Sequence, residues 1–175
     1  MMLKRGGFVG LMAAGLLLTS AQALAEDVPI NITGTIQIPP CQVNDGKTIV
    51  VDFGDVSVAD VANERNRRKV TVPVKCSYAQ GTAYVKVTGT QLSNNTNVLK
   101  TDVDNFGIAL YQGDGTVTKL LLGNGPNSFG YPIQTGLSGK ENGAFTFTAI
   151  PFKEGNKDLM AGAFVASANM SITYI

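Results

Sequence analysis

The sequence predicts an all-β sandwich or barrel folded as one domain. Short runs in which β-branched and aromatic residues alternate with polar ones recur along the chain, clusters rich in glycine and asparagine separate them, and no long helical pattern occurs. The chain has 175 residues, of which 44% are hydrophobic, enough for one packed core. About eight strands fit between the turn signals.

The first 25 residues are expected to be a secretory signal peptide. Lys4 and Arg5 precede an apolar run at 8–18, which is too short to span a bilayer core of about 30 Å. Ala23 and Ala25 form the small-x-small pattern typical of a cleavage site, so the mature chain would begin at Glu26. No later run approaches about 18 apolar residues, so we expect no membrane insertion of the mature chain.

The expected strands follow the alternating runs in chain order. They cover residues 49–53, 70–74, 84–88, 106–111, 117–122, 144–150 and 163–175. Pro73 lacks a backbone donor, so it indicates an edge or a bulge in its run. Turns are expected at 112–115 and at the Gly/Asn/Pro-rich segment 123–130.

The two cysteines, Cys41 and Cys76, are expected to form a disulfide. A lone pair of cysteines usually does so in an exported protein, because that compartment is oxidising. The bond would close a loop of about 35 residues and stabilise the fold by roughly 3.8 kcal/mol in the chain-entropy estimate. A redox-active pair would need closer spacing, such as Cys-x-x-Cys.

Two segments near the ends of the mature chain alternate over a long stretch. Because side chains of a strand alternate between its faces, each segment has one apolar face. In the first segment that face holds Val28, Ile30, Ile32, Gly34, Ile36 and Ile38; in the last it holds Phe164, Ala166, Ala168, Met170, Ile172 and Tyr174. Periodicity alone also fits two ordinary strands of a closed sandwich, so it does not say whose core these faces fill.

Composition excludes several classes of function. Fourteen basic residues against 13 acidic ones argue against a nucleic-acid binder. Histidine is absent, which excludes His-dependent triads, and two cysteines are too few for a Cys-only zinc site. The acids show no calcium-loop spacing. We therefore expect no catalytic residues, no metal and no cofactor; the basic stretch Arg65–Lys69 is either a solvated loop or a site for an acidic partner.

Four features in this order resemble the pilins of chaperone–usher fimbriae. They are the alternating segment with Gly34, the pair Cys41 and Cys76, a glycine fourteenth from the end at Gly162, and the penultimate Tyr174. Motifs at 38–41, 51–54, 106–113 and 145–148 resemble the tip-adaptor class of P pili, which joins the adhesin to the tip fibre.

The resemblance implies an incomplete immunoglobulin-like sandwich that a donated strand completes. Residues 26–40 would form the donor-strand extension and 41–175 the pilin domain. The acceptor groove and chaperone-binding strand would include Gly162, Phe164, Ala166, Ala168, Met170, Ile172, Tyr174 and Ile175. The implied partners are a periplasmic chaperone, an outer-membrane usher, adjacent pilins and the tip adhesin, and the implied location is the cell-surface fimbria.

The chief rival is a secreted β-sandwich domain that binds carbohydrate directly. Export and the all-β pattern suit it, but tryptophan is absent and adhesins of this family are longer, with two domains. A secreted hydrolase is a weaker alternative, since no catalytic constellation is visible.

Overall fold

The computed structural model describes residues 27–137 and 139–175, so the predicted signal peptide lies outside the described residues. Contacts divide the chain after Thr35 into two units. The described part of the first unit, residues 27–35, forms no strand, and its apolar side chains are exposed, from 78% for Val28 to 88% for Ile32. The second unit, residues 36–175, holds every strand described below.

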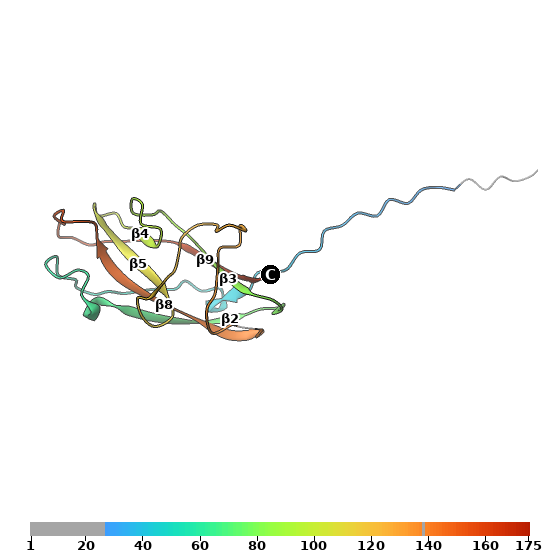
Figure 1. The fold of residues 1–175 in the computed structure, drawn as a ribbon, viewed down its shortest axis with the longest axis horizontal. Helices are drawn as coiled ribbons and strands as arrows, with labels where there is room; N and C mark the ends of the chain where they lie inside the picture. Colours follow the sequence, from blue (N-terminus) through green and yellow to red (C-terminus); the bar gives the residue numbers. More distant parts are fainter. Residues whose placement is uncertain (1–26, 138) are drawn as a thin grey trace, which may run out of the picture. The chain divides into compact units, whose positions relative to one another are not determined.

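The larger sheet is antiparallel and follows the order β1-β2-β8-β5-β4, with β6 paired to β5. Figure 1 labels β2, β8, β5 and β4 of this sheet. Its long members are β2 (Arg68–Lys75), β5 (Phe106–Gln112) and β8 (Asn142–Lys153). The shorter ones are β1 (Gln42–Val43), β4 (Val98–Lys100) and β6 (Thr118–Lys119).

The smaller sheet places β3 (Ala83–Thr88) between β7 (Tyr131–Pro132) and β9 (Asn169–Tyr174). All six residues of β3 pair with β9, from Ala83 opposite Tyr174 to Thr88 opposite Asn169. The described residues contain no α-helix, only the 3₁₀ turns η1 (Asn44–Gly46) and η2 (Glu64–Asn66). The predicted all-β class is therefore confirmed.

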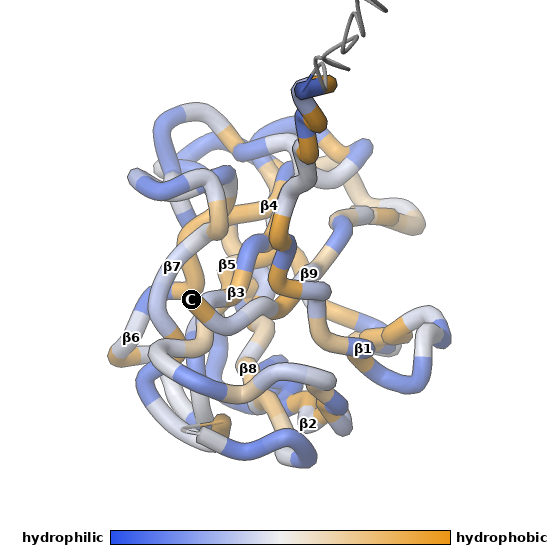
Figure 2. The backbone as a smooth tube through the Cα atoms, turned by 90° about the vertical axis from the view of Figure 1, so that its right-hand side faces the viewer, coloured by the Kyte–Doolittle hydropathy of each residue, from blue (hydrophilic) through white to orange (hydrophobic). Residues whose placement is uncertain are grey.

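The core lies between the two sheets because the inward faces of their strands are apolar. Val74 and Phe145 of the larger sheet are each 1% exposed, and Val85, Ile172 and Tyr174 of the smaller sheet are fully buried. Figure 2 shows the hydrophobic segments gathered along the strands, with loops around them that are largely hydrophilic.

The disulfide Cys41–Cys76 is present, as predicted, and it ties the two sheets together. The Cys41 N–H donates to the Ile172 carbonyl of β9 at 2.8 Å, while the next two residues pair with the end of β2. The chain therefore passes from the smaller sheet to the larger one at Cys41, and the covalent bond to Cys76 fixes this crossing.

Three expectations about strands need correction. Residues 49–53 and 163–168 alternate as predicted but belong to no strand, because no neighbouring segment in the described chain forms a ladder with them. The predicted strand 117–122 shrinks to Thr118–Lys119, since only these two residues pair with β5. The prediction for Pro73 holds instead: within β2 it pairs with β8 on one side, and on the other side the two-residue β1 ends short of it, which leaves an edge there.

Replacing both Cys41 and Cys76 by serine should lower the free energy of unfolding of the mature protein by about 2–5 kcal/mol, because the unfolded chain loses a closed loop. Urea unfolding of the oxidised wild type and the double variant measures the difference. Wild type treated with reductant is the control and should shift by a similar amount. A loss below about 1 kcal/mol would contradict this account of the bond.

Candidate functional site

A groove runs between two segments that belong to no strand, residues 49–56 and residues 159–168, and continues beside the start of β9. We call these sides the 49–56 wall and the 159–170 wall. Two cavities make up the groove, of about 360 Å³ and about 630 Å³. Val51, Phe53 and Phe164 line both cavities, so the two are neighbours along one channel.

The smaller cavity is an apolar slot whose floor is the interior of the sandwich. Its walls contribute Ile49, Val51 and Phe53 on one side and Phe164, Ala166, Ala168 and Met170 on the other. The floor comes from β3, β4, β5 and β8 through Val87, Leu99, Ile108, Leu110, Phe147 and Ala149. Such a lining suits apolar side chains that enter from above.

Both walls alternate like strands although neither is fully paired. In the 49–56 wall, Phe53 is buried and Val51 half-buried, whereas Val50 is 80% exposed. Among the described residues, no backbone–backbone hydrogen bond joins this wall to another strand. In the 159–170 wall, Val165 bonds to Asp102, with its carbonyl accepting from the backbone N–H and its own N–H donating to the carboxylate. The walls therefore present backbone donors and acceptors beside an apolar slot, which is what an added strand requires.

Three aromatic rings narrow the groove where its two cavities meet. The Phe164 ring lies edge-on to Phe106 with centroids 4.8 Å apart, and its centroid is 6.1 Å from that of Phe53. Phe53 and Phe164 belong to opposite walls, so their approach divides the groove into two compartments. A strand that lies along the groove therefore has the least room for a side chain at the position between Phe53 and Phe164.

The structure divides the predicted groove residues into three groups. Phe164, Ala166, Ala168 and Met170 line the smaller cavity, and Gly162 lines the larger one. Ile172 and Tyr174 instead lie in the domain's own core, each fully buried. Ile175 is 43% exposed and exchanges two backbone hydrogen bonds with Thr82.

Tyr174 is a core aromatic whose hydroxyl reaches the edge of the sandwich. The hydroxyl donates to the Lys140 carbonyl at 3.2 Å and accepts from the Lys140 N–H at 3.3 Å. Its packing and hydrogen bonds therefore hold the last strand to the loop before β8.

Sequence reasoning missed the other wall as part of the site. The run at 49–53 is visible as an alternating segment, but nothing in its pattern indicates that it faces residues 164–170 across a groove. That relation is long-range, and only the fold shows it.

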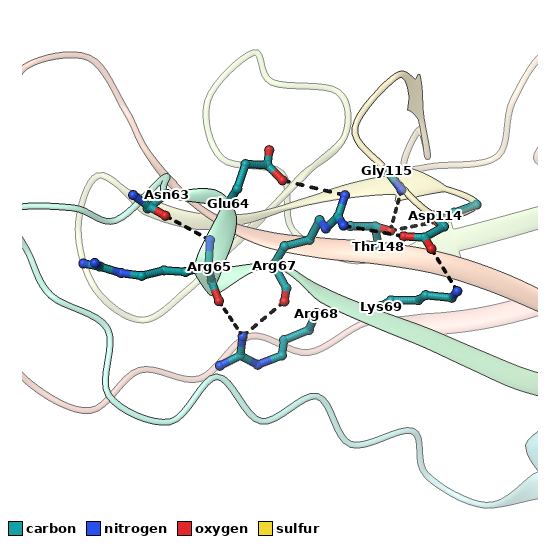
Figure 3. Close-up of polar contacts among 10 residues, drawn as sticks. Asn63, Glu64, Arg65, Arg67, Arg68, Lys69, Asp114, Gly115 and Thr148 are labelled. Carbon is teal, nitrogen blue, oxygen red and sulfur yellow. Dashed lines mark hydrogen bonds and ion pairs between the residues drawn. The ribbon is translucent and has the colours of Figure 1, made fainter.

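The basic stretch Arg65–Lys69 is engaged with acidic groups of the same domain (Figure 3). Lys69 Nζ lies 2.9 Å from Asp114 Oδ2, and Arg67 lies 3.8 Å from the other oxygen of that carboxylate. Arg65 pairs with Asp60 at 2.5 Å. The hydrogen bond from Lys69, and then its charge, hold the pKa of Asp114 below its ordinary value of 3.8. These contacts favour a structural role over capture of an acidic partner.

No cluster of three or more Cys, Asp or Glu side chains suitable for a metal ion occurs within residues 27–137 and 139–175. Over the same part of the chain, no helix has the length and apolarity to cross a membrane.

Comparison with known proteins shows which family this chain belongs to. The family model described as fimbrial protein matches residues 30–175, nearly all of the described chain. The chain belongs to the fimbrial protein family. The predicted resemblance to chaperone–usher pilins is thereby confirmed.

Two relatives from Escherichia coli align over almost their whole length. The fimbrial adapter PapF is 46% identical over 160 residues, which cover 91% of this chain and 94% of PapF. The minor fimbrial protein PrsF is 45% identical over the same shares. Among solved structures, the P pilus adaptor subunit PapF aligns with a TM-score of 0.57 and 36% identity, covering 81% of this chain and all of that one.

The P pilus rod subunit PapA shares the fold at 19% identity, with a TM-score of 0.53 over 84% of this chain and all of PapA. This match supports the immunoglobulin-like pilin architecture alone.

Replacing Asp114 by asparagine should make stability less sensitive to acid. Because the folded-state pKa lies below the unfolded value, the carboxylate stabilises the fold above about pH 4, and this contribution is lost as pH falls through the folded pKa. Between about pH 2 and 6, the free energy of unfolding in urea should therefore fall less steeply with acid in the variant, and it should converge with that of wild type at the lowest pH.

The matched control is Asp104→Asn, which removes an exposed carboxylate that makes no ion pair within the described residues. An acid slope equal to that of wild type would contradict the prediction.

Proposed function

We propose that this protein is a minor pilin, an adaptor that links the adhesin to the tip fibre by exchange of donor strands. The observation that carries the proposal is the groove, whose two apolar walls alternate like strands and leave backbone groups available. A neighbouring subunit donates a strand to this groove, and residues 28–38 serve as the donor for the next subunit.

The groove has the properties of a strand acceptor. An added strand pairs through main-chain hydrogen bonds and places every second side chain in a pocket. Here the pockets are lined by residues of both walls and by the sandwich interior, such as Ile49, Ala166 and Leu110. A strand in this position also covers an apolar sheet edge, which is otherwise an aggregation hazard.

The N-terminal extension has the properties of a donor. Val28, Ile30, Ile32 and Ile36 are 78–101% exposed and share one face of an extended chain with Ile38, which is 40% exposed. Burial of these five side chains would contribute about 7–15 kcal/mol. Ordering the extension opposes this by about 1–2 kcal/mol per residue, so ladder hydrogen bonds and slow dissociation must supply much of the affinity.

Gly34 fits the same scheme. A Cβ built at Gly34 meets no atom within 4 Å, so no contact within its own surroundings requires glycine there. The aromatic narrowing between Phe53 and Phe164 offers a reason, because a related groove in the neighbour would accept only a residue without a side chain at that point.

Assembly would follow the route of the family. A periplasmic chaperone lends a strand to the groove during export, and exchange for the neighbour's extension takes place at the outer-membrane usher. Ile175 follows β9 and is 43% exposed, so a chaperone could contact it there. The relatives named adapter and minor fimbrial protein support the adaptor position and a location in the surface fimbria.

Ile32→Asp should block assembly, because it places a charge without a partner in the neighbour's apolar groove. Asn31→Asp adds the same charge on the polar face of the extension and is the matched control. Pilus number and adhesin retention on cells that express each variant measure the effect. Assembly of Ile32→Asp at the level of Asn31→Asp would refute the donor role.

A further inference from the structure

One arginine binds the middle of the 49–56 wall. The Arg68 side chain donates from Nε to the Asp52 carbonyl at 3.0 Å and from Nη2 to the Phe53 carbonyl at 2.7 Å. Its Nη1 donates to the carbonyls of Arg65 and Arg67, at 3.1 Å each (Figure 3). The guanidinium thus joins four backbone carbonyls, two of which belong to the wall.

The hydrogen bonds from Arg68 hold the wall in place of the backbone hydrogen bonds that a neighbouring strand would supply. Consecutive carbonyls of a straight strand point to opposite sides, so two of them can meet one guanidinium only where the backbone bends. The bend continues into Gly54, whose φ is +60° and whose N–H donates to the Asp52 carboxylate at 2.9 Å. Arg68 and this turn together determine where the strand-like part of the wall ends.

The same contact orients the ring that narrows the groove. The Arg68 guanidinium carbon lies 5.7 Å from the centroid of the Phe53 ring, within range of a cation–π interaction. The same ring also lies against Phe164 on the opposite wall, with the centroids 6.1 Å apart. Arg68 opens β2 and faces Ala149 of β8 in the ladder register, so it anchors Phe53 to the larger sheet.

We infer that Arg68 is a positioning residue for strand capture, which fixes the 49–56 wall and the Phe53 ring before a donor strand arrives. The inference rests on the proposed function. A wall that is already ordered loses less conformational freedom when a strand binds, so the bound state is favoured. Lysine cannot replace arginine here, because its single ammonium lacks the planar array of donors that reaches four carbonyls.

The test uses the mature chain with residues 27–38 appended after Ile175 through a flexible linker, which supplies a donor strand at high effective concentration. Amide hydrogen exchange at 49–51 reports capture, since the N–H groups of this segment that face the added strand, every second one along it, gain ladder partners only when the strand binds. Arg68→Gln and Arg68→Lys are compared with Arg65→Gln, a matched variant whose side chain pairs with Asp60 instead.

Both Arg68 variants should exchange about tenfold faster at 49–51 than the parent fusion, with Arg65→Gln within about twofold of it. Exchange at β8 amides separates positioning from general stability and should change little. Parent-like exchange in Arg68→Gln, rescue by Arg68→Lys, or an equal rise at β8 would each overturn the inference. If the parent fusion itself gains no protection over the chain without the added strand, the donor-strand function fails, and this inference fails with it.

Discussion

The architecture depends on one constraint: two apolar segments, residues 49–53 and 163–168, have the alternation of strands but no ladder between them in the described chain. Backbone polar groups beside apolar surface are costly to leave without partners. The side chains show no such deficit, since every buried side-chain nitrogen or oxygen in the described residues has a hydrogen-bond partner. The defect is therefore local, and the sandwich around it is complete enough to keep the groove in shape.

The two sides of the groove are held by different means. The 159–170 wall ends in the first two residues of β9, which pair with β3, so the ladder of the smaller sheet holds that end of the wall. The 49–56 wall lies between two irregular segments and depends on side-chain contacts, chiefly those of Arg68, and on the turn at Gly54. The 159–170 wall is therefore the more firmly held side, whereas the position of the 49–56 wall depends on a few polar contacts.

Local alternation was enough to predict most of the fold. The strong runs at 70–74, 84–88 and 144–150 became β2, β3 and β8, and two cysteines in an exported chain were enough to predict the disulfide. Alternation shows which face a side chain takes, but not which backbone lies beside it. For that reason the sequence predicted one continuous apolar surface from Phe164 to Tyr174. In the structure this face lines the groove as far as Met170, whereas Ile172 and Tyr174 lie in the core. Arg68 was hidden for a similar reason, because a basic run usually indicates solvated charge.

The crossing at Cys41 has a mechanical consequence. In the proposed fibre, tension on the N-terminal extension would enter the domain at this residue. Cys41 is bonded covalently to Cys76, just beyond β2, and through its N–H to Ile172 of β9. The load would therefore divide between both sheets at Cys41. Shear would then not begin to unfold the domain by peeling the short strand β1 from β2.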